Sequence, residues 1–430
     1  MSFIVSFLKR NAKLDSNTSF SSNQKTLVSY KNSVNNTYNR LISNLKSNPL
    51  VKSSLFKETN FIEIVSASIA LINDQFNKIY LSFQTNTKIL TWRIEGPFDS
   101  SYSLSILNKN FALALSKTGQ DVVLHSTEGP GDFTPSLQFL QNNPHVNKLY
   151  QKSKSSKSDI FISSRNLYPP RVDDLDSHIN LLHAYGWEES SFPSEWVDKF
   201  NNSLTGLTVM SNQVKKILID NGVQLPIRVS GLGLDHLRNI KSTTDFKIKA
   251  KKFKILHISS CFPRKGIDIL LQAFSNAFTC FDEVSLIIKT FDNPHNEIDS
   301  LLEKFKRSNV NFPDVILIKD DLTDGQIKSL YEQSDVLVAP SRGEGFGLPI
   351  AEAMLLGIPV ITTNWGGQVD FANQRTSWLI DYEFVLSTSH FDLDLSYWAE
   401  PSIEHLSLLL KKIYNLSKDE IDKKVDKAKE

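Results

Sequence analysis

From residue 88 onward, the apolar positions alternate between two periodicities. Short apolar runs of the kind that form buried strands are separated by stretches in which apolar residues recur at helical spacing. In the first half of the chain the predicted strands are 89–94, 121–125, 160–163, 179–182, 206–210 and 227–230, with a helix at 103–117. Strands that alternate with helices predict a parallel sheet with crossover helices.

The alternation restarts after a charged stretch, 236–252, which we interpret as a linker. The strands predicted beyond it are 253–258, 284–289, 314–318, 336–339 and 360–362, and the helices are 267–278, 297–307, 324–333 and 349–356. A second sheet predicts a second doubly wound domain, so we divide the chain at 86–240 and 241–430. Ligands of open parallel sheets bind beyond the carboxyl ends of the strands, which predicts a site in a cleft that the two domains face.

The first 85 residues have a different composition. Residues 14–57 are rich in Ser, Asn and Lys, whereas 61–83 carries apolar residues near helical spacing. We therefore expect 1–85 to be a polar, mostly helical extension. The apolar start, 1–8, precedes two basic residues and no small-residue cleavage site follows it, so we interpret it as a short helix and not as a targeting segment.

Charge and cysteine content exclude several classes of protein. The 430-residue chain has 48 Lys and Arg against 47 Asp and Glu, so no overall positive field favours nucleic acid as a partner. Two cysteines are too few for a disulfide framework, which favours the reducing cytoplasm. The longest apolar stretch, 64–72, is too short to span a bilayer. We expect at most a peripheral contact with the inner face of the membrane.

The densest chemical signal is the segment 341–354, SRGEGFGLPIAEAM, which follows a predicted strand. Its glycines let the backbone approach a ligand closely, and Pro349 suits the first turn of a helix. Seven residues separate Glu344 on the loop from Glu352 on the helix, so both carboxylates can face one crevice. One could then hold sugar hydroxyls and the other a ribose. From these residues alone, a plain turn with solvated acids remains the alternative.

A second signal is the strand, loop and helix at 255–268, with Arg264 and Lys265 just beyond the strand. An Arg fork and a Lys charge in a cleft would neutralise a diphosphate and the charge that develops on it as a glycosidic bond breaks. Adjacent basic residues on a loop are also commonly just solvated.

The first half offers weaker candidates. Gly96 follows a predicted strand and precedes a helix that carries Asn108, and an ordinary strand-to-helix turn would explain it nearly as well. His183 ends an apolar run, where a histidine is commonly a hydrogen-bonded core residue. Glu188 is a weaker candidate for an acid or base on the acceptor side.

The pattern predicts neither a metal nor another cofactor. The pairs Asp174/Asp176 and Asp392/Asp394 imitate the paired aspartates of metal-dependent transferases, but neither follows a convincing strand. The nine histidines lack zinc-site spacing, and neither a phosphate-loop lysine motif nor a nicotinamide fingerprint occurs.

With these motifs in place, the chain between residues 90 and 410 resembles glycosyltransferase family 4. The signature of that family sets two glutamates, seven residues apart, around a Gly-Phe-Gly-Leu-Pro core, and an Arg-Lys-Gly arrangement precedes it. The resemblance implies a GT-B fold, a nucleotide-diphosphate sugar as donor, and a glycan or lipid-linked saccharide as acceptor. It also implies transfer of a hexosyl or deoxyhexosyl group with retention at the anomeric carbon, without metal, in which the leaving phosphate deprotonates the acceptor.

The same resemblance assigns roles to residues. It implies catalytic roles for Glu344, Arg264, Lys265 and His183, the last as the histidine that contacts the transferred sugar. It implies donor binding by Gly96, Gly345, Phe346, Gly347, Leu348 and Glu352.

Two other functions fit the same fold. A non-catalytic module would bind a nucleotide sugar or glycan without transfer, and an epimerase or hydrolase would act without an acceptor. The charged tail, 416–430, raises a further alternative. Chains of this family usually end in a helix that crosses back to the first domain, so either this tail makes the crossover or the chain is a piece of a larger protein.

Overall fold

The computed structural model describes residues 91–100, 102–129, 131–155, 160–388, 393 and 395–429. The predicted extension at 1–85 lies outside these residues, as do Asp392 and Asp394.

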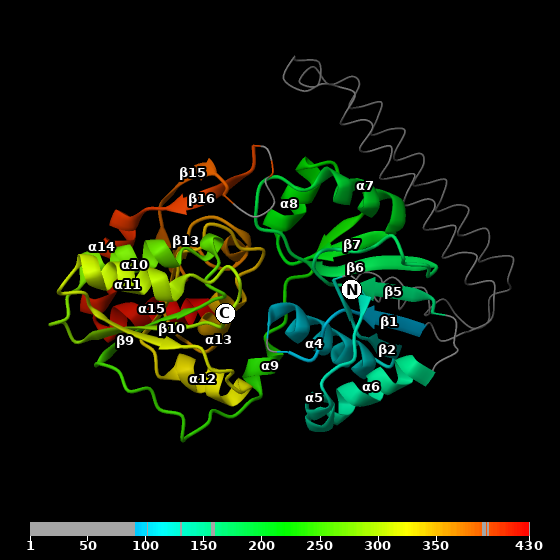
Figure 1. Cartoon of the computed structure of the whole chain (residues 1–430), viewed down its shortest axis with the longest axis horizontal. Helices are drawn as coiled ribbons and strands as arrows, with labels where there is room; N and C mark the ends of the chain where they lie inside the picture. Colours follow the sequence, from blue (N-terminus) through cyan, green and yellow to red (C-terminus); the bar gives the residue numbers. More distant parts are fainter. Residues whose placement is uncertain are drawn as a thin grey trace, which may run out of the picture. The chain divides into compact units, whose positions relative to one another are not determined.

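The first sheet has six parallel strands in the order β2-β1-β5-β6-β7-β8 (Figure 1). Their bounds are β1 Thr91–Glu95, β2 Asp121–His125, β5 Ile162–Arg165, β6 Ile179–Tyr185, β7 Gly206–Val209 and β8 Ile227–Val229. The helices between them are α4 Ser103–Lys117, α5 Leu137–Asn142, α6 Pro144–Ser155, α7 Ser194–Ser203 and α8 Asn212–Asp220. A short antiparallel pair, β3 Thr127–Glu128 and β4 Gly131–Asp132, follows β2. We call these elements the first domain.

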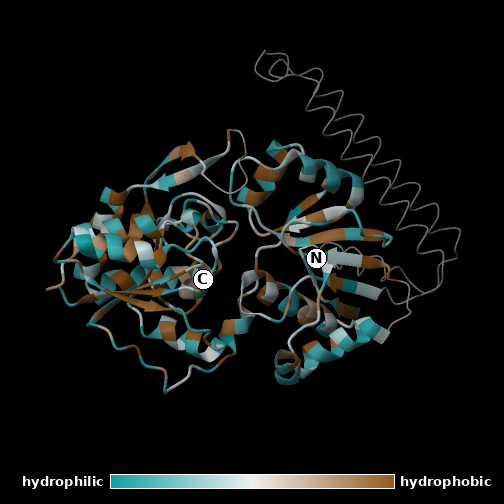
Figure 2. Cartoon of the chain, viewed as in Figure 1, coloured by the Kyte–Doolittle hydropathy of each residue, from teal (hydrophilic) through white to brown (hydrophobic). Residues whose placement is uncertain are grey.

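Alternate residues of the first strands build its core. Trp92 and Ile94 on β1 pack with Ala112 and Leu115 of α4, and Leu149 of α6 joins the same cluster. Every second residue of β1 and residues at helical spacing on α4 face this core, so both periodicities can be recognised in the sequence. In Figure 2 the strands and helices of this domain each carry both brown and teal segments, as the two periodicities require.

The second sheet also has six parallel strands, in the order β11-β10-β9-β12-β13-β14. Its strands are β9 Phe253–Ile258, β10 Val284–Lys289, β11 Asp314–Ile318, β12 Val336–Ala339, β13 Val360–Thr363 and β14 Trp378–Ile380. Its helices are α10 Ile267–Ala277, α11 Ile298–Ser308, α12 Asp324–Glu332, α13 Leu348–Leu355, α14 Ile403–Asn415 and α15 Lys418–Lys429, with short 3-10 turns η1 Pro263–Lys265 and η2 Gly367–Asp370. We call these elements the second domain.

Both faces of the second sheet are buried, which explains its continuous apolar strands. Ile255 and Leu286 point to the cluster that contains α10, α11 and α14. Their chain neighbours Leu256 and Ile287 point to the opposite cluster, which contains α12 and α13. The sequence-based prediction of two doubly wound α/β domains is therefore confirmed.

The charged stretch interpreted as a linker packs against the second domain along much of its length. It begins with α9 Asp235–Arg238, in which Leu237 is buried, and then runs beside α12. Thr243 N donates to Gly325 O at 3.2 Å, and Ile248 N donates to the Gln333 side chain at 3.1 Å. Polar residues, several of them lysines, separate the apolar residues of this stretch. The sequence pattern therefore did not indicate that they are packed.

The tail helix α15 packs against α13 of the second domain. Val425 is buried there, and Lys424 Nζ donates to the backbone oxygens of Gln374 and Ser377 at 2.7 and 2.6 Å. These contacts are all made with the second domain, whereas one of the two alternatives for this tail was a crossover to the first domain. Preceding it, β15 Tyr382–Leu386 and β16 Tyr397–Pro401 form an antiparallel hairpin.

Candidate functional site

Each sheet has one point at which the chain order reverses, and loops that carry most of the candidate residues follow the strands at these points. In the second sheet the reversal falls between β9 and β12, and in the first sheet between β1 and β5. The loops that follow such a strand pair diverge and leave a crevice at the carboxyl edge. Arg264 and Lys265 follow β9, and Glu344 follows β12.

Lys265 and Glu344 form an ion pair, although they lie 79 positions apart in the chain. Lys265 Nζ donates to Glu344 Oε1 at 2.6 Å, and Ser341 Oγ donates to the same oxygen at 2.7 Å. The backbone also connects the two loops, because Arg342 N donates to Arg264 O at 2.7 Å. The structure thus brings the two predicted loops into contact.

This pair is nearly buried, with 14% of the Lys265 side chain and 9% of the Glu344 side chain exposed. Burial alone would raise the pKa of Glu344, but Lys265, Arg264 and the Ser341 hydroxyl together lower it below its usual value. Burial lowers the pKa of Lys265, and Arg264 adds to this lowering while Glu344 opposes it. The result is a carboxylate held in its charged form beside two basic groups, in a place with little water to screen them.

Glycines allow the backbone to fold this tightly. Gly266 has φ of 66°, and a Cβ on it would lie 2.0 Å from Pro340 O. Gly347 has φ of 86° and precedes the first turn of α13. A side chain at position 266 would push the two loops apart, and one at position 347 would be strained by its positive φ.

Arg264 points to the first domain. Its Nη2 lies 3.2 Å from Glu188 Oε1, and its Nη1 donates to Gly343 O at a long 3.4 Å. The backbone of Gly343 approaches Glu188 so closely that a Cβ there would lie 2.5 Å from Glu188 O. Nearby, Ser211 Oγ donates to Gly345 O at 2.7 Å. The glycine loop is therefore held by residues of both domains.

Glu352, predicted to bind a ribose, lies on α13 and is buried. Tyr331 Oη donates to its Oε2 at 2.7 Å, and His236 Nε2 lies 2.8 Å from its Oε1. The motif residues between the two glutamates are largely packed: Phe346 is buried with its ring 5.0 Å from that of Phe371, and Leu348 starts α13. Glu352 thus contacts a different set of side chains from Glu344.

In the first domain, Gly96 follows β1 with φ of 149°. A Cβ there would lie 2.2 Å from Asn108 Nδ2 and 2.3 Å from Asn166 O. Asn108 Nδ2 donates to Pro97 O and to Asn166 O, both at 2.9 Å. Asn108 thereby ties the loops after β1 and β5 together, so the need for glycine at position 96 has a structural origin.

His183 is a hydrogen-bonded interior residue. Because the Asn108 amide group donates to carbonyls, its Oδ1 accepts from His183 Nε2 at 2.7 Å, and His183 Nδ1 accepts from Ser164 Oγ at 3.0 Å. Burial lowers the pKa of the ring to about 3, and the ring stacks on Phe111 at 4.6 Å. Both ring nitrogens are occupied within the first domain. These two hydrogen bonds fix the orientation of the ring, and the predicted contact of His183 with the transferred sugar stays a prediction.

Sequence reasoning missed Arg342, which is the most extensively bonded residue of the site region. Its guanidinium donates to Asp268 at 2.9 and 2.7 Å, to Glu400 at 2.5 and 2.7 Å, and to Pro263 O at 2.6 Å. It also lies 5.5 Å from the centre of the Trp398 ring. Arg342 therefore fixes the glycine loop to η1, to α10 and to β16. The only sequence signal for Arg342 was its position within the segment 341–354.

The aspartates that imitate a metal pair have basic partners where the structure describes them. Asp174 accepts from Arg165 at 2.5 Å and from Arg171 at 3.1 Å, and Asp176 lies 3.6 Å from Arg93. Within the described ranges, no group of three or more His, Cys, Asp or Glu side chains is arranged to hold a metal ion. The helices among those residues also include none with the length and apolar composition that a membrane span requires.

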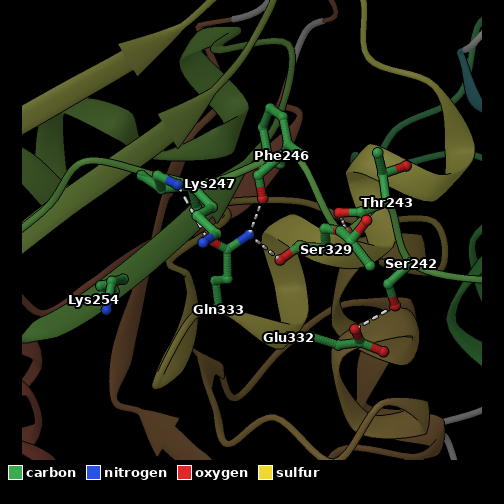
Figure 3. A pocket seen from close by; sticks show the side chains of 10 residues that line it. Ser242, Thr243, Phe246, Lys247, Lys254, Ser329, Glu332 and Gln333 are labelled. Carbon is green, nitrogen blue, oxygen red and sulfur yellow. Dashed lines mark hydrogen bonds between the residues drawn. The ribbon is translucent and has the colours of Figure 1, made fainter.

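A pocket of about 510 Å³ lies away from these residues, between the packed linker and α12 (Figure 3). Its walls carry both polar and apolar side chains, and several of the polar groups are hydrogen-bonded to one another. Gln333 Nε2 donates to Phe246 O and to Ser329 O at 2.9 Å, and Ser242 donates to Glu332. The residues that line it include none of the predicted site residues.

Comparison with known proteins gives a consistent picture. Residues 240–382, about a third of the chain, match the family model described as "Glycosyl transferases group 1". The chain is 27% identical over 176 residues to an uncharacterised 41.2 kDa protein in the cps region of Klebsiella pneumoniae, which covers 41% of this chain and 43% of that protein. It is 28% identical over 189 residues to the capsular polysaccharide biosynthesis glycosyltransferase CapM of Staphylococcus aureus, covering 41% and 48%. The chain thus spans less than half the length of these curated relatives.

Among solved structures, the chain is similar to a sucrose-phosphate synthase from Thermosynechococcus elongatus. The TM-score is 0.57 at 15% identity, over 79% of this chain and 93% of that one. At this identity the likeness concerns the fold, and it confirms the predicted GT-B architecture of two Rossmann-like domains.

Proposed function

We propose that this chain is a retaining glycosyltransferase of family 4 that transfers a hexosyl or deoxyhexosyl group from a nucleotide-diphosphate sugar to a glycan or lipid-linked acceptor. The observation that carries the proposal is the buried Lys265–Glu344 pair beside Arg264, at the reversal point of the second sheet. The match of residues 240–382 to group 1 glycosyl transferases supports the same reaction class.

The basic residues account for the departure of the diphosphate. In the proposed reaction, Lys265 and Arg264 bind the phosphates and neutralise the charge that grows as the glycosidic bond breaks. Because Lys265 is nearly buried, its attraction to that charge is weakly screened and needs little rearrangement. The two side chains supply positive charge where a metal ion would otherwise do so, which is why we propose a metal-independent reaction without another cofactor.

The carboxylates orient the donor. Glu344, with the backbone at 345–348, is proposed to hold the sugar, and Glu352 to accept hydrogen bonds from the nucleotide ribose. Glu352 already accepts from Tyr331, and each carboxylate oxygen has a second lone pair for a ligand. Catalysis by this set of residues is chiefly positional and electrostatic.

Retention and the role of the leaving phosphate as base are proposed on the resemblance to family 4. In that mechanism neither Glu344 nor Glu352 has to act as a base. This agrees with Glu344 being held in an ion pair with Lys265. The acceptor is proposed to be a saccharide of a cell-surface polymer. The name of the Staphylococcus aureus relative supports this setting, as does the location of the Klebsiella pneumoniae one in a cps region.

The experiment that tests the proposal incubates the protein with a panel of nucleotide sugars, with and without saccharide acceptors. Free nucleotide and sugar-extended acceptor are separated and quantified. A transferase produces both in equal amounts, whereas a hydrolase or epimerase changes the donor without an acceptor, and a binding module changes neither. Glu344→Ala should abolish transfer while its circular dichroism spectrum stays that of the wild type. Near-normal transfer by that variant would refute the assignment.

A further inference from the structure

Arg264 is held by a carboxylate of the other domain. Its Nη2 lies 3.2 Å from Glu188 Oε1, with 25% of the Arg264 side chain and 30% of the Glu188 side chain exposed. The further contact of its guanidinium with Gly343 O is long, at 3.4 Å. The guanidinium that the proposed function assigns to the diphosphate is thus already engaged with an anion.

The loop that carries Glu188 is well fixed. It follows β6, and Trp187 Nε1 donates to Ser191 O at 2.8 Å. Beyond Glu188, Ser190 N donates to Tyr397 O at 3.1 Å, and Glu189 accepts from Ser387 and Ser396 at 2.7 and 2.8 Å. The position of Glu188 opposite Arg264 is therefore built by the surrounding contacts and is not the chance position of a mobile surface side chain.

A carboxylate and a phosphate compete for the same donors of an arginine. Both present two oxygens to the planar guanidinium fork, so one group can replace the other with little change in geometry. The two basic residues differ in this respect. The partner of Lys265 belongs to its own domain and is nearly buried, whereas the partner of Arg264 belongs to the first domain and is three times more exposed.

We propose that Glu188 is an internal competitor for the donor diphosphate: it occupies Arg264 in the empty site and releases it when a diphosphate binds. The inference rests on the proposed function, since it assumes that Arg264 binds phosphate. Its consequence is that Glu188 lowers the affinity for the donor, and that donor binding breaks a contact between the two domains.

The test measures binding of inorganic pyrophosphate by isothermal titration calorimetry. Glu188→Gln keeps the size of the side chain and removes its charge. A partly exposed ion pair contributes up to about 1 kcal/mol, so this variant should bind pyrophosphate two- to five-fold more tightly than the wild type. Asp370→Asn is the control, because Asp370 pairs with Asn212 and not with Arg264, yet the net charge changes equally. Its affinity should stay within the error of the wild-type value.

A double-mutant cycle shows whether Glu188 acts through Arg264. In an Arg264→Gln background, Glu188→Gln should leave the affinity for pyrophosphate unchanged. An equal gain in both backgrounds, or an equal gain in Asp370→Asn, would mean a general electrostatic effect and would overturn the inference. Unchanged or weaker binding by Glu188→Gln alone would overturn it too. If the folded wild type does not bind pyrophosphate at all, it is the proposed phosphate site that fails.

Discussion

Replacing Lys265 by Met tests whether the central ion pair forms in solution. Met has nearly the length of Lys, so the change removes the ammonium group and leaves the packing of the aliphatic stem largely in place. Glu344, with 9% of its side chain exposed, would then be a buried carboxylate without its main counter-ion. Removing one partner of a buried pair typically costs about 3–5 kcal/mol of unfolding free energy. Ser341 still donates to Glu344, so we expect about 3 kcal/mol.

The pH dependence gives this prediction a sign. The pKa of Glu344 is lowered in the folded wild type, so its ionisation adds stability above the pKa of the unfolded chain, and this stability is lost as the pH falls through the folded pKa. In Lys265→Met the carboxylate loses its largest favourable partner, and burial then raises its folded pKa relative to the wild type. The stability difference between the two proteins should therefore grow as the pH rises through the acid range.

The measurement is urea unfolding followed by tryptophan fluorescence at pH 5 and pH 7.5. The double variant Lys265→Met/Glu344→Gln is the matched control, because it removes both charges and should recover much of the loss. A single variant whose unfolding free energy lies within about 0.5 kcal/mol of the wild type at pH 7.5 would contradict the reasoning, because losses of buried pairs are far larger.

Three further predictions concern stability. Gly266→Ala should lower the unfolding free energy, measured by thermal unfolding, by more than about 3 kcal/mol. Gly119→Ala is the control, because Gly119 also has a positive φ but open space around it, and it should cost about 1 kcal/mol. Equal losses would count against the close approach of Gly266 to Pro340 O. Arg342→Ala should lower the free energy of urea unfolding by about 2 kcal/mol, because Asp268 and Glu400 lose their shared cation but remain partly solvated. A loss below about 0.5 kcal/mol would contradict the role of Arg342 in fixing the glycine loop. The unfolding free energy of the wild type should fall by about 2 kcal/mol between pH 6.5 and pH 5 through His183. With a pKa of about 3 the folded ring stays neutral, while the ring in the unfolded chain binds a proton. His183→Gln should reduce this dependence of stability on pH, and the same dependence in both proteins would refute the buried neutral ring.

Much of the fold could be predicted because its signals are local. The strands 253–258, 284–289, 314–318 and 336–339 have the bounds that apolar runs predicted, since both faces of this sheet are buried. The packing of the linker against α12 could not be predicted in this way, because its few apolar residues stand among charges.

That the loops of Lys265 and Glu344 lie close together could also be predicted, although the residues are far apart in sequence; the ion pair between them was not predicted. Parallel topology brings the ends of β9 and β12 together, and each residue lies just beyond one of them. The partners of Arg342, Glu188 and His183 could not be predicted in this way. Each partner lies on a separate element of the chain. Its distance from the residue depends on how helices, the hairpin and loops pack, which the spacing of apolar residues does not predict.

The most direct test of the central claim is a thermal-shift screen of nucleoside diphosphates with the wild type and Arg264→Ala. A ligand that binds only the folded protein stabilises it by about 2.7 kcal/mol at a hundred times its Kd, enough to raise Tm by several degrees. We predict that at least one nucleoside diphosphate raises the Tm of the wild type and that the shift is much smaller in Arg264→Ala. A wild-type Tm that no nucleoside diphosphate changes, or an equal shift in both proteins, would contradict the assignment of this corner to the donor.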